Sequence, residues 1–339
     1  MPTAGIIGTG LIGGSVAVGL SGAGWDVIGF DADPDTLRTA RERGLVDTSV
    51  DSVAGIVAAE PDVIVVAAPP KATIEILSNL DTGLVVMDVA GIKSDVVAAA
   101  GHLPKFVGTH PMAGRETSGP ASASPALFKG ANWIIVEGSP PEATEQVAGV
   151  VQALGANPVL MSAEAHDRVV AAVSHLPQLL AAGLLGSAAE TEDALMLAAG
   201  SFRDLTRVAA SQPLPWVEIL KSNEAAVSAA IDALRDHLDR VEAAIAAPDD
   251  TLLSYLSRSR DVRRSLGAPV MPVRISLADE PGEIARVGQA LAESHVDVRD
   301  IQIRHAPHGG GGVLTVSVRA GEEEALRHSL DDVGLTTLP

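Results

Sequence analysis

The stretch Gly8-Thr9-Gly10-Leu11-Ile12-Gly13 decides the fold of this 339-residue chain. It has the spacing G-x-G-x-x-G, follows a strand-like run at Ala4–Ile7 and opens a helical run at Leu11–Ser21. In such a βαβ unit the first glycine makes a tight turn, the second lets the backbone approach a pyrophosphate, and the third lets helix and strand pack closely. The N-terminus of the helix then presents free N–H groups to the phosphates. The stretch therefore predicts a dinucleotide site, and a glycine turn that binds nothing is the alternative.

An acidic residue at the end of the next strand indicates which dinucleotide binds. Asp31 follows the strand-like run Asp26–Phe30 at the spacing expected of the carboxylate that binds the adenosine ribose. A carboxylate there favours a free 2′-hydroxyl and repels a 2′-phosphate, so we expect NAD rather than NADP. The following strand ends at Ala67-Ala68-Pro69-Pro70, where small residues leave room for a flat cofactor, although an ordinary loop is the alternative. The predicted cofactor contacts are Gly8, Thr9, Gly10, Leu11, Ile12, Gly13, Asp31, Ala68 and Pro69.

The order of predicted strands and helices along the chain indicates three domains. Residues 1–162 alternate strands and helices, which predicts an α/β, Rossmann-type domain with a mostly parallel, doubly wound sheet. Residues 163–266 read as an all-helical domain, with a helix at Ala163–Gly186 kinked at Pro177, one long helix at Pro215–Ala247, and a charged linker at Asp249–Gly267. Residues 270–339 form a separate α+β module. The strands predicted for the first part are Ala4–Ile7, Asp26–Phe30, Val63–Ala67, Leu84–Asp88, Phe106–Gly108, Trp133–Val136 and Pro158–Met161.

The long helix carries a stripe of apolar residues at alternating spacings of four and three. Such a stripe packs along another long helix, either within the chain or across a homodimer interface, and we expect a homodimer. The stripe consists of Val227, Ile231, Leu234, Leu238, Val241 and Ile245.

Composition excludes several classes of protein. The net charge of −19 repels nucleic acid and anionic membranes, and we expect neither as a partner. The chain has no cysteine, which excludes disulfides, thiol nucleophiles and cysteine metal sites, and we expect no metal. With no signal peptide and no run of about 18 apolar residues, we expect a cytoplasmic protein.

Four segments outside the glycine turn carry reactive side chains. They are Asp88–Ser94 (DVAGIKS), Gly108–Gly119 (GTHPMAGRETSG), Ser174–Gln178 (SHLPQ) and Gly200–Trp216 (GSFRDLTRVAASQPLPW). The HPMAG and FRDLTRVA motifs are specific, and with them the chain from Gly5 to Ala247 resembles the prephenate/arogenate dehydrogenase family. The resemblance implies NAD-dependent oxidative decarboxylation of prephenate or arogenate on the route to tyrosine. A non-catalytic, amino-acid-sensing dimer that keeps the nucleotide fold is the alternative from another class.

The resemblance also implies roles for individual residues. His110 is the catalytic base, a role that suits an imidazole because its pKa lies near working pH; a structural histidine in a turn is the alternative. Arg207 pairs with a substrate carboxylate, and Arg203 is a second candidate that could instead pair with Asp204. Lys93 either contacts substrate, orders the site or pairs with an acid. Glu116 contacts or gates the substrate, and Trp216 is either an aromatic at the pocket edge or plain core.

The chain departs from the family pattern at two positions. The serine that often hydrogen-bonds the catalytic histidine is replaced by Gly91, so we expect something else, such as water, to orient His110. The second histidine of SHLPH is replaced by Gln178, a neutral side chain that could shift preference toward arogenate, which carries an ammonium where prephenate has a keto oxygen. His175 is retained as a substrate-site candidate, with a core histidine as the alternative.

The C-terminal module resembles an ACT domain. The run Asp279–Ile284 opens a helix between strands at Val273–Leu277 and Val298–Arg304, and Asp279 could cap that helix. The resemblance implies a regulatory site for an amino acid, and tyrosine is the effector we expect. A module that only adds dimer contacts is the alternative.

Overall fold

The computed structural model describes residues 1–114, 117–265, 270–278, 280–305 and 311–338. The chain separates into two compact units, Met1–Asp236 and His237–Pro339, and the division falls within helix α11 (Glu224–Ala246). The three ranges predicted from the sequence stay a prediction.

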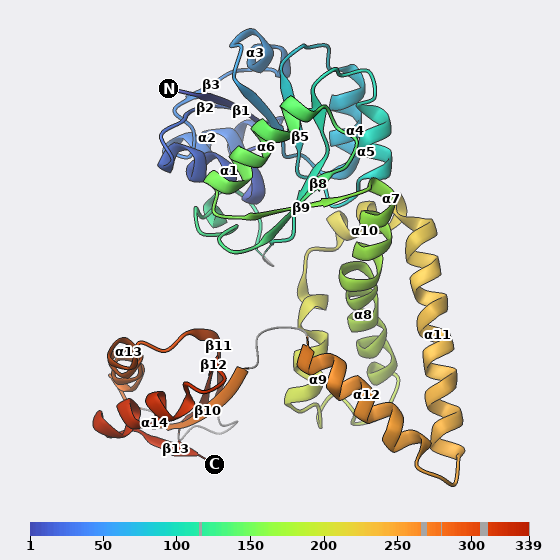
Figure 1. Ribbon diagram of the computed structural model, residues 1–339, viewed down its shortest axis with the longest axis vertical. Coiled ribbons are helices and arrows are strands. Elements are labelled where there is room, and N and C mark those ends of the chain that lie inside the picture. Colours follow the sequence, from blue (N-terminus) through green and yellow to red (C-terminus); the bar gives the residue numbers. More distant parts are fainter. Residues whose placement is uncertain (115–116, 266–269, 279, 306–310, 339) are drawn as a thin grey trace. The chain divides into compact units, whose positions relative to one another are not determined.

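A six-stranded parallel sheet forms the centre of the first unit (Figure 1). The strand order β3-β2-β1-β4-β5-β6 places the glycine-rich turn after β1 at the middle of the sheet, as the Rossmann-type prediction required. The strands are β1 (Thr3–Ile7), β2 (Asp26–Phe30), β3 (Thr48–Ser49), β4 (Val63–Val66), β5 (Val85–Asp88) and β6 (Phe106–Val107).

Helices cover both faces of this sheet, so its strands are apolar on both sides. Ile6, Val65 and Met87 face α1 (Leu11–Gly22) and α6 (Pro141–Ala153) in one core cluster. Ile7, Ile64 and Val86 face the opposite layer in a second cluster. That layer is made of α3 (Val53–Ala58), α4 (Pro70–Asn79) and α5 (Ser94–Ala99), and α2 (Pro34–Glu42) follows β2.

A second, smaller sheet departs from the prediction of one doubly wound sheet. It has the order β7-β8-β9, in which β7 (Thr109–Pro111) is antiparallel to β8 (Asn132–Val136) and β8 is parallel to β9 (Asn157–Met161). His110 was expected in a turn-rich segment, but it lies on β7 opposite Ile134. A short 3₁₀ turn, η1 (Pro120–Ser122), lies in the connection from β7 to β8.

The helical run that follows β9 contains a π-helical turn. It consists of α7 (Ala163–Val170), the π turn η2 (Ala171–His175) and α8 (Leu176–Ala189). Pro177 lies in the first turn of α8, where its missing N–H is tolerated, so the irregularity precedes the proline rather than being centred on it.

The predicted long helix Pro215–Ala247 is wrong, because the structure breaks it at Asn223. The chain runs through α9 (Gly200–Thr206), the 3₁₀ turn η3 (Arg207–Ala210), α10 (Pro213–Ser222) and then α11. Asn223 leaves helical geometry, with φ −119° and ψ 31°, and its buried amide donates to the Asp167 carbonyl oxygen at 2.8 Å. This long-range bond fixes the break, and local sequence periodicity does not reveal it.

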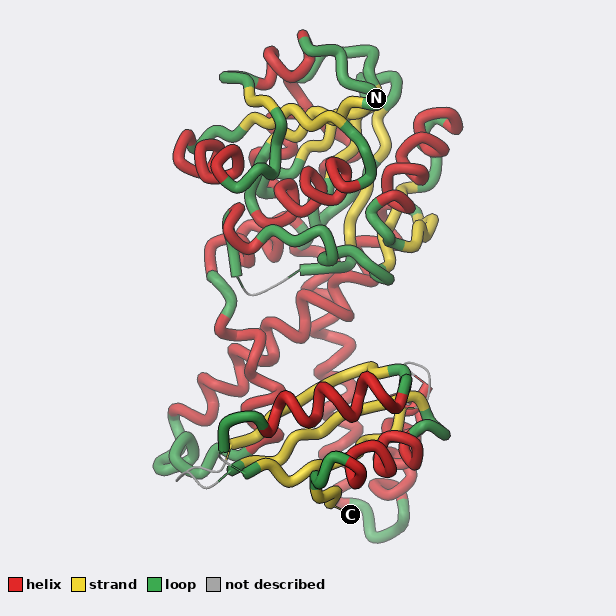
Figure 2. Tube along the Cα trace, turned by 90° about the vertical axis from the view of Figure 1, so that its left-hand side faces the viewer, coloured by secondary structure: helices red, strands yellow, loops and turns green. Residues whose placement is uncertain are grey.

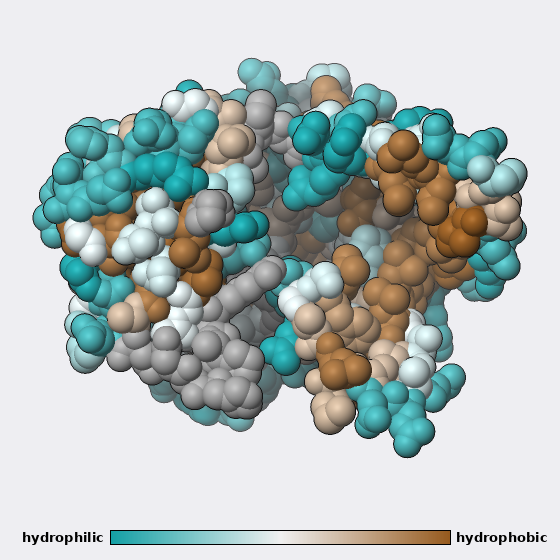
Figure 3. Space-filling view, turned by 90° about the horizontal axis from the view of Figure 1, so that it is seen from below, coloured by the Kyte–Doolittle hydropathy of each residue, from teal (hydrophilic) through white to brown (hydrophobic). Residues whose placement is uncertain are grey.

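Much of the apolar surface of the helical segment is exposed, and Figure 3 shows it as brown atoms on the right-hand part of the view. Val173 is 60% exposed, and Leu184 and Leu197 are exposed as well. Among the described residues, Ala163–Ala189 has the length and composition of a membrane-spanning helix, and 22% of its most apolar window is buried. That is weak evidence for a span, since core helices of soluble proteins have the same composition.

The second unit contains the predicted α+β module. Its sheet has the antiparallel order β11-β12-β10-β13, and α13 and α14 lie side by side on one face (Figure 2). The predicted linker Asp249–Gly267 is wrong, because a helix, α12 (Thr251–Ser265), occupies most of it. Asp279, expected as a helix cap, lies outside the described residues. The elements are β10 (Val270–Leu277), α13 (Glu283–Ser294), β11 (Val298–His305), β12 (Gly312–Arg319), α14 (Glu323–Asp332) and β13 (Thr336–Leu338).

Candidate active site

The glycine turn has the shape that a bound pyrophosphate requires. Gly8 has φ +95°, and a Cβ there would lie 2.4 Å from the Ala67 carbonyl oxygen. A Cβ on Gly13 would lie 1.8 Å from the Gly8 carbonyl oxygen, so helix and strand touch at this point. A Cβ on Gly10, by contrast, would meet no described atom within 4 Å. The middle glycine therefore faces open space, while the outer two are required by the packing.

The N-terminus of α1 provides an electrostatic environment that favours an anion. The helix begins at Leu11 and Ile12, and within the described chain it has no side-chain cap and no acidic residue in its first turn. Its free N–H groups and its dipole are therefore available to an anion. These features fit the two phosphates of a dinucleotide.

Asp31 and the Ala68-Pro69 pair border the same turn. The Asp31 carboxylate accepts from the Thr9 backbone N–H at 2.7 Å, which fixes the acid beside the glycine turn. Ala68 and Pro69 follow β4, the strand next to β1, and the Ala68 carbonyl oxygen accepts from the Thr73 hydroxyl at 2.9 Å. The structure thus brings the sequence-predicted cofactor residues together at one edge of the sheet.

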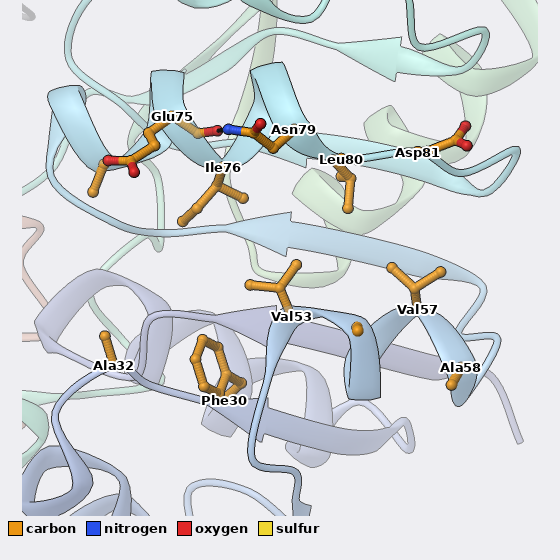
Figure 4. A pocket seen from close by; sticks show the side chains of 12 residues that line it. Phe30, Ala32, Val53, Val57, Ala58, Glu75, Ile76, Asn79, Leu80 and Asp81 are labelled. Atoms are coloured by element: carbon orange, nitrogen blue, oxygen red, sulfur yellow. Dashed lines mark hydrogen bonds between the residues drawn. The ribbon is translucent and has the colours of Figure 1, made fainter.

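A cavity of about 680 Å³ lies between α3 and α4, next to the end of β2 (Figure 4). Val53 and Val57 of α3 face Ile76 of α4 and Leu80, which follows that helix, across it. Phe30 and Ala32, the two neighbours of Asp31, line it as well. An apolar cavity beside the Asp31 carboxylate suits a flat heteroaromatic ring.

A buried ion pair anchors the strand that carries His110. Lys93 and Asp88 are both fully buried, and the Lys93 ammonium pairs with the Asp88 carboxylate and donates to the Thr109 carbonyl oxygen at 2.7 Å. The Thr109 N–H donates to Asp88 at 2.9 Å, and the Trp133 indole N–H donates to the Thr109 hydroxyl at 2.9 Å. Burial lowers the pKa of Lys93, and the charge of Asp88 opposes that effect. The Lys93 ammonium is sequestered from solvent, which fits the alternatives that Lys93 orders the site and pairs with an acid.

His110 is oriented by a second histidine, which takes the place expected for something other than the missing serine. The His110 Nδ1 lies 2.8 Å from the His166 Nε2, and the His166 Nδ1 lies 2.9 Å from an oxygen of Asp167. Asp167 also accepts from the backbone N–H groups of Lys93 and Ser94, each at 2.8 Å. A continuous chain of hydrogen bonds therefore links the catalytic candidate to the N-terminus of α5.

The electrostatics of this chain favour a neutral His110 beside an ionised Asp167. Burial lowers the pKa of His110 well below its ordinary value, and His166 lowers it further, while Asp167 opposes these effects. Burial raises the pKa of Asp167, but the hydrogen bonds from His166 and Ser94 outweigh it and bring that pKa to about 2. A neutral imidazole is the form that can accept a proton.

Two of the substrate-binding candidates, Gln178 and Trp216, line one cavity, which is formed by three distant segments. The cavity has a volume of about 310 Å³. Gly114 of the HPMAG motif, Gln178 of SHLPQ and Trp216 line it. Trp216 therefore lies at the pocket edge, as the first of its two alternatives predicted. The remaining lining residues are Val173, Ser174, Pro177, Val208 and Ser211.

The other candidates are not among the residues that line this cavity, or lie outside the described chain. Arg207 begins η3, one residue before the lining residue Val208, and both Arg207 and Arg203 are exposed. His175 is 2% exposed, so it fits the alternative of a core histidine, and burial lowers its pKa. Its Nδ1 lies 3.3 Å from the Asn223 amide nitrogen. Glu116 lies outside the described residues.

Sequence reasoning missed His166, Asp167 and Asn223. One signal for the first two was available, since Ala163, His166, Asp167 and Val170 recur at helical spacing and form the buried face of α7. A polar pair on the apolar face of a helix needs partners there. Among the described residues no cluster of acids and histidines suits a metal ion.

Comparisons with known proteins agree with this geometry. Three family descriptions match: "Prephenate dehydrogenase, nucleotide-binding domain" at residues 17–160, "Prephenate dehydrogenase, dimerization domain" at 162–258 and "ACT domain" at 273–328. The prephenate dehydrogenase of Lactococcus lactis is 32% identical over 305 residues, covering 83% of this chain and 84% of that protein. That of Bacillus subtilis is 30% identical over 344 residues, covering 94% and 92%.

Solved structures give the same result. Prephenate dehydrogenase from Aquifex aeolicus, in complex with hydroxyphenyl propionate and NAD+, has a TM-score of 0.72 at 28% identity, covering 79% of this chain and 99% of that one. Arogenate dehydrogenase from Synechocystis has a TM-score of 0.69 at 28% identity, covering 78% of this chain and 100% of that one. With relatives at this identity and coverage, and with the two prephenate dehydrogenase domains matched along residues 17–258, the chain belongs to the prephenate dehydrogenase family.

Proposed function

We propose that this protein is an NAD-dependent prephenate dehydrogenase, which converts prephenate to 4-hydroxyphenylpyruvate with loss of carbon dioxide. The observation that carries the proposal is the cavity lined by Gly114, Gln178 and Trp216, because it joins three motifs that lie far apart in the chain. The family match and the glycine turn support the same assignment.

The edge of the sheet that carries the glycine turn and Asp31 fits NAD in three respects. The α1 N-terminus would hold the pyrophosphate, and the Asp31 carboxylate would accept hydrogen bonds from the ribose hydroxyls. The apolar cavity between α3 and α4 would take the adenine ring. When bound, NAD supplies the hydride acceptor. The carboxylate of Asp31 disfavours a 2′-phosphate, which supports NAD over NADP.

His110 would serve as the base for the substrate hydroxyl. Its lowered pKa keeps the ring neutral, so its unprotonated nitrogen can accept the hydroxyl proton at neutral pH. A Cβ on Gly91 would lie 3.7 Å from the His110 Nε2, so that nitrogen faces a position without a side chain. The substrate hydroxyl would approach from this side.

Prephenate is a dianion, so a protein with a net charge of −19 must supply local cations. Arg207 adjoins Val208 at the cavity, and a guanidinium can bind a carboxylate through two parallel hydrogen bonds. We therefore assign Arg207 to carboxylate binding, with Arg203 one helical turn away as a second candidate. The proposal also assigns Glu116 to the substrate loop.

Arogenate is a second candidate substrate, and Gln178 favours it. Its side-chain oxygen is buried at the cavity and has no hydrogen-bond partner among the described residues. The ammonium of arogenate offers three donors to such an oxygen, whereas the keto group of prephenate offers none. The similarity to an arogenate dehydrogenase agrees with this alternative.

We also propose a homodimer with an amino-acid site in the ACT domain. The dimerisation-domain match and the exposed apolar side chains of α8 and α9 support pairing with a second copy, which would cover them. The ACT match supports an effector site, for which tyrosine is the candidate. A cytoplasmic location stays a prediction of the sequence.

The direct test is a comparison of initial rates of reduced cofactor formation with prephenate and arogenate, each with NAD and NADP, with and without tyrosine. The proposal expects the highest kcat/KM for prephenate with NAD. Higher kcat/KM for arogenate would favour the second candidate. No turnover of either substrate would leave the non-catalytic alternative.

A further inference from the structure

We infer that His166 and Asp167 are positioning residues that hold His110 in one tautomer, with its proton on Nδ1 and its lone pair on Nε2. This inference rests on the proposed role of His110 as the base. It adds two residues to the site that lie behind the imidazole and do not touch substrate.

The direction of each hydrogen bond follows from the acid at the end of the chain. Asp167 is ionised, so its carboxylate only accepts hydrogen bonds, and the His166 Nδ1 at 2.9 Å must carry a proton. When His166 carries only that one proton, its Nε2 is unprotonated and accepts. The His110 Nδ1, 2.8 Å from that nitrogen, must therefore be the donor. The lone pair of His110 is left on Nε2, the nitrogen that faces Gly91.

Hydrogen bonds from the backbone and from Asn223 hold Asp167 in place. Asp167 accepts from the N–H groups of Lys93 and Ser94 at the start of α5, and Asn223 donates to the Asp167 carbonyl oxygen. His166 is fully buried, and its ring meets the His110 ring at 74° with the centroids 5.0 Å apart. Neither imidazole can rotate freely without breaking a hydrogen bond.

Such an arrangement matters most when the base becomes charged. A proton accepted at Nε2 makes His110 an imidazolium, and its Nδ1–H then donates a charge-assisted hydrogen bond to His166. The carboxylate behind His166 lowers the energy of that cation. A carboxylate that sets a histidine tautomer is a general device for activating a base, here extended by one imidazole.

Histidine tautomers in the full-length, ¹⁵N-histidine-labelled protein test the inference without substrate. Two-bond proton–nitrogen spectra distinguish Nδ1–H from Nε2–H, and the variants His110→Asn and His166→Phe assign the two signals. We expect both rings to be protonated at Nδ1 at neutral pH. His110 protonated at Nε2 would overturn the inference.

The variant Asp167→Asn tests the inference through kcat and KM. An amide has only one oxygen, so it cannot accept on both sides as the carboxylate does, and it lacks the negative charge behind His166. Where its nitrogen faces the His166 Nδ1, both hydrogen bonds reverse and the His110 proton moves to Nε2. We expect kcat to fall about 10²- to 10⁴-fold, in the range found when a histidine is held in the wrong tautomer, with KM changed less than about threefold. Asp95→Asn, which removes an exposed acid from the first turn of the same helix α5, is the matched control and leaves both values unchanged.

His166→Phe covers the case in which Asp167→Asn fails to fold, since it keeps the bonds of Asp167 to the backbone. We expect His110 to become a mixture of tautomers and kcat to fall at least about tenfold. Unchanged kcat and an unchanged His110 tautomer in a folded variant would overturn the inference. Failure of the proposed function is a separate result, because it appears as no turnover in the unaltered protein.

Discussion

The variant Lys93→Met replaces the buried cation of the site, and we expect it to lower the free energy of unfolding. Methionine has a similar length but leaves the Asp88 carboxylate buried without a counter-charge. It also removes the donor to the Thr109 carbonyl oxygen, which precedes His110 on β7. Removing one partner of a buried ion pair costs about 3–5 kcal/mol. For a unit the size of Met1–Asp236, each kcal/mol lowers Tm by roughly 2–4 °C, so we expect a decrease of about 6–20 °C.

Thermal unfolding followed by circular dichroism measures this change, and bound NAD identifies the transition of the nucleotide-binding unit by raising its Tm. The matched control is Arg38→Met, which breaks an ion pair whose side chains are 62% and 73% exposed. Such a pair contributes about 0–1 kcal/mol, so the control should lower Tm by at most about 4 °C. Equal changes in the two variants would refute the argument that the Lys93–Asp88 pair holds the site together.

Three further predictions concern the substrate cavity and the base. Arg207→Ala should raise KM about 10- to 100-fold with a smaller change in kcat, as expected when a charge-assisted hydrogen bond of about 1.5–3 kcal/mol is lost; an unaltered KM in steady-state assays would remove Arg207 from substrate binding. Gln178→Glu should raise the ratio of kcat/KM for arogenate to that for prephenate by about tenfold or more, because it adds a negative charge near the ammonium; a ratio that falls would contradict the cavity assignment. The pKa of His110 is lowered, so the base form persists below pH 6.5, and kcat/KM should fall only as the pH drops through that lower pKa; an acid limb at or above pH 6.5 would disagree with the burial of the ring.

The nucleotide-binding site was well predicted because residues close together in the sequence form it. The tight turn at Gly8, the open approach at Gly10 and the helix–strand contact at Gly13 each follow from residue type and spacing within one βαβ unit. The carboxylate of Asp31 follows from the same unit. All three segments at the substrate cavity were recognised from the sequence, but the motifs did not reveal the interactions between segments.

The errors arise where contacts between distant residues decide the structure. Asn223 breaks a helix because its amide bonds to Asp167, 56 residues earlier. Lys93 is sequestered because its ammonium reaches the Thr109 carbonyl oxygen on β7, 16 residues later, as well as the nearby Asp88. His166 replaces the serine missing at position 91 from the opposite side of the imidazole. The pairings of Asn223 with Asp167 and of His110 with His166 each join residues 56 positions apart, so no spacing rule in a single sequence contains them.

The turnover of His110→Asn tests the central claim most directly. With prephenate and NAD at saturation, we predict that the rate of NADH formation falls by about 10²-fold or more, the usual range for a lost general base, while the NAD affinity measured by fluorescence titration stays within about twofold of the unaltered protein. A variant that binds NAD normally and turns over at the unaltered rate would contradict the claim that the imidazole on β7 removes the substrate proton.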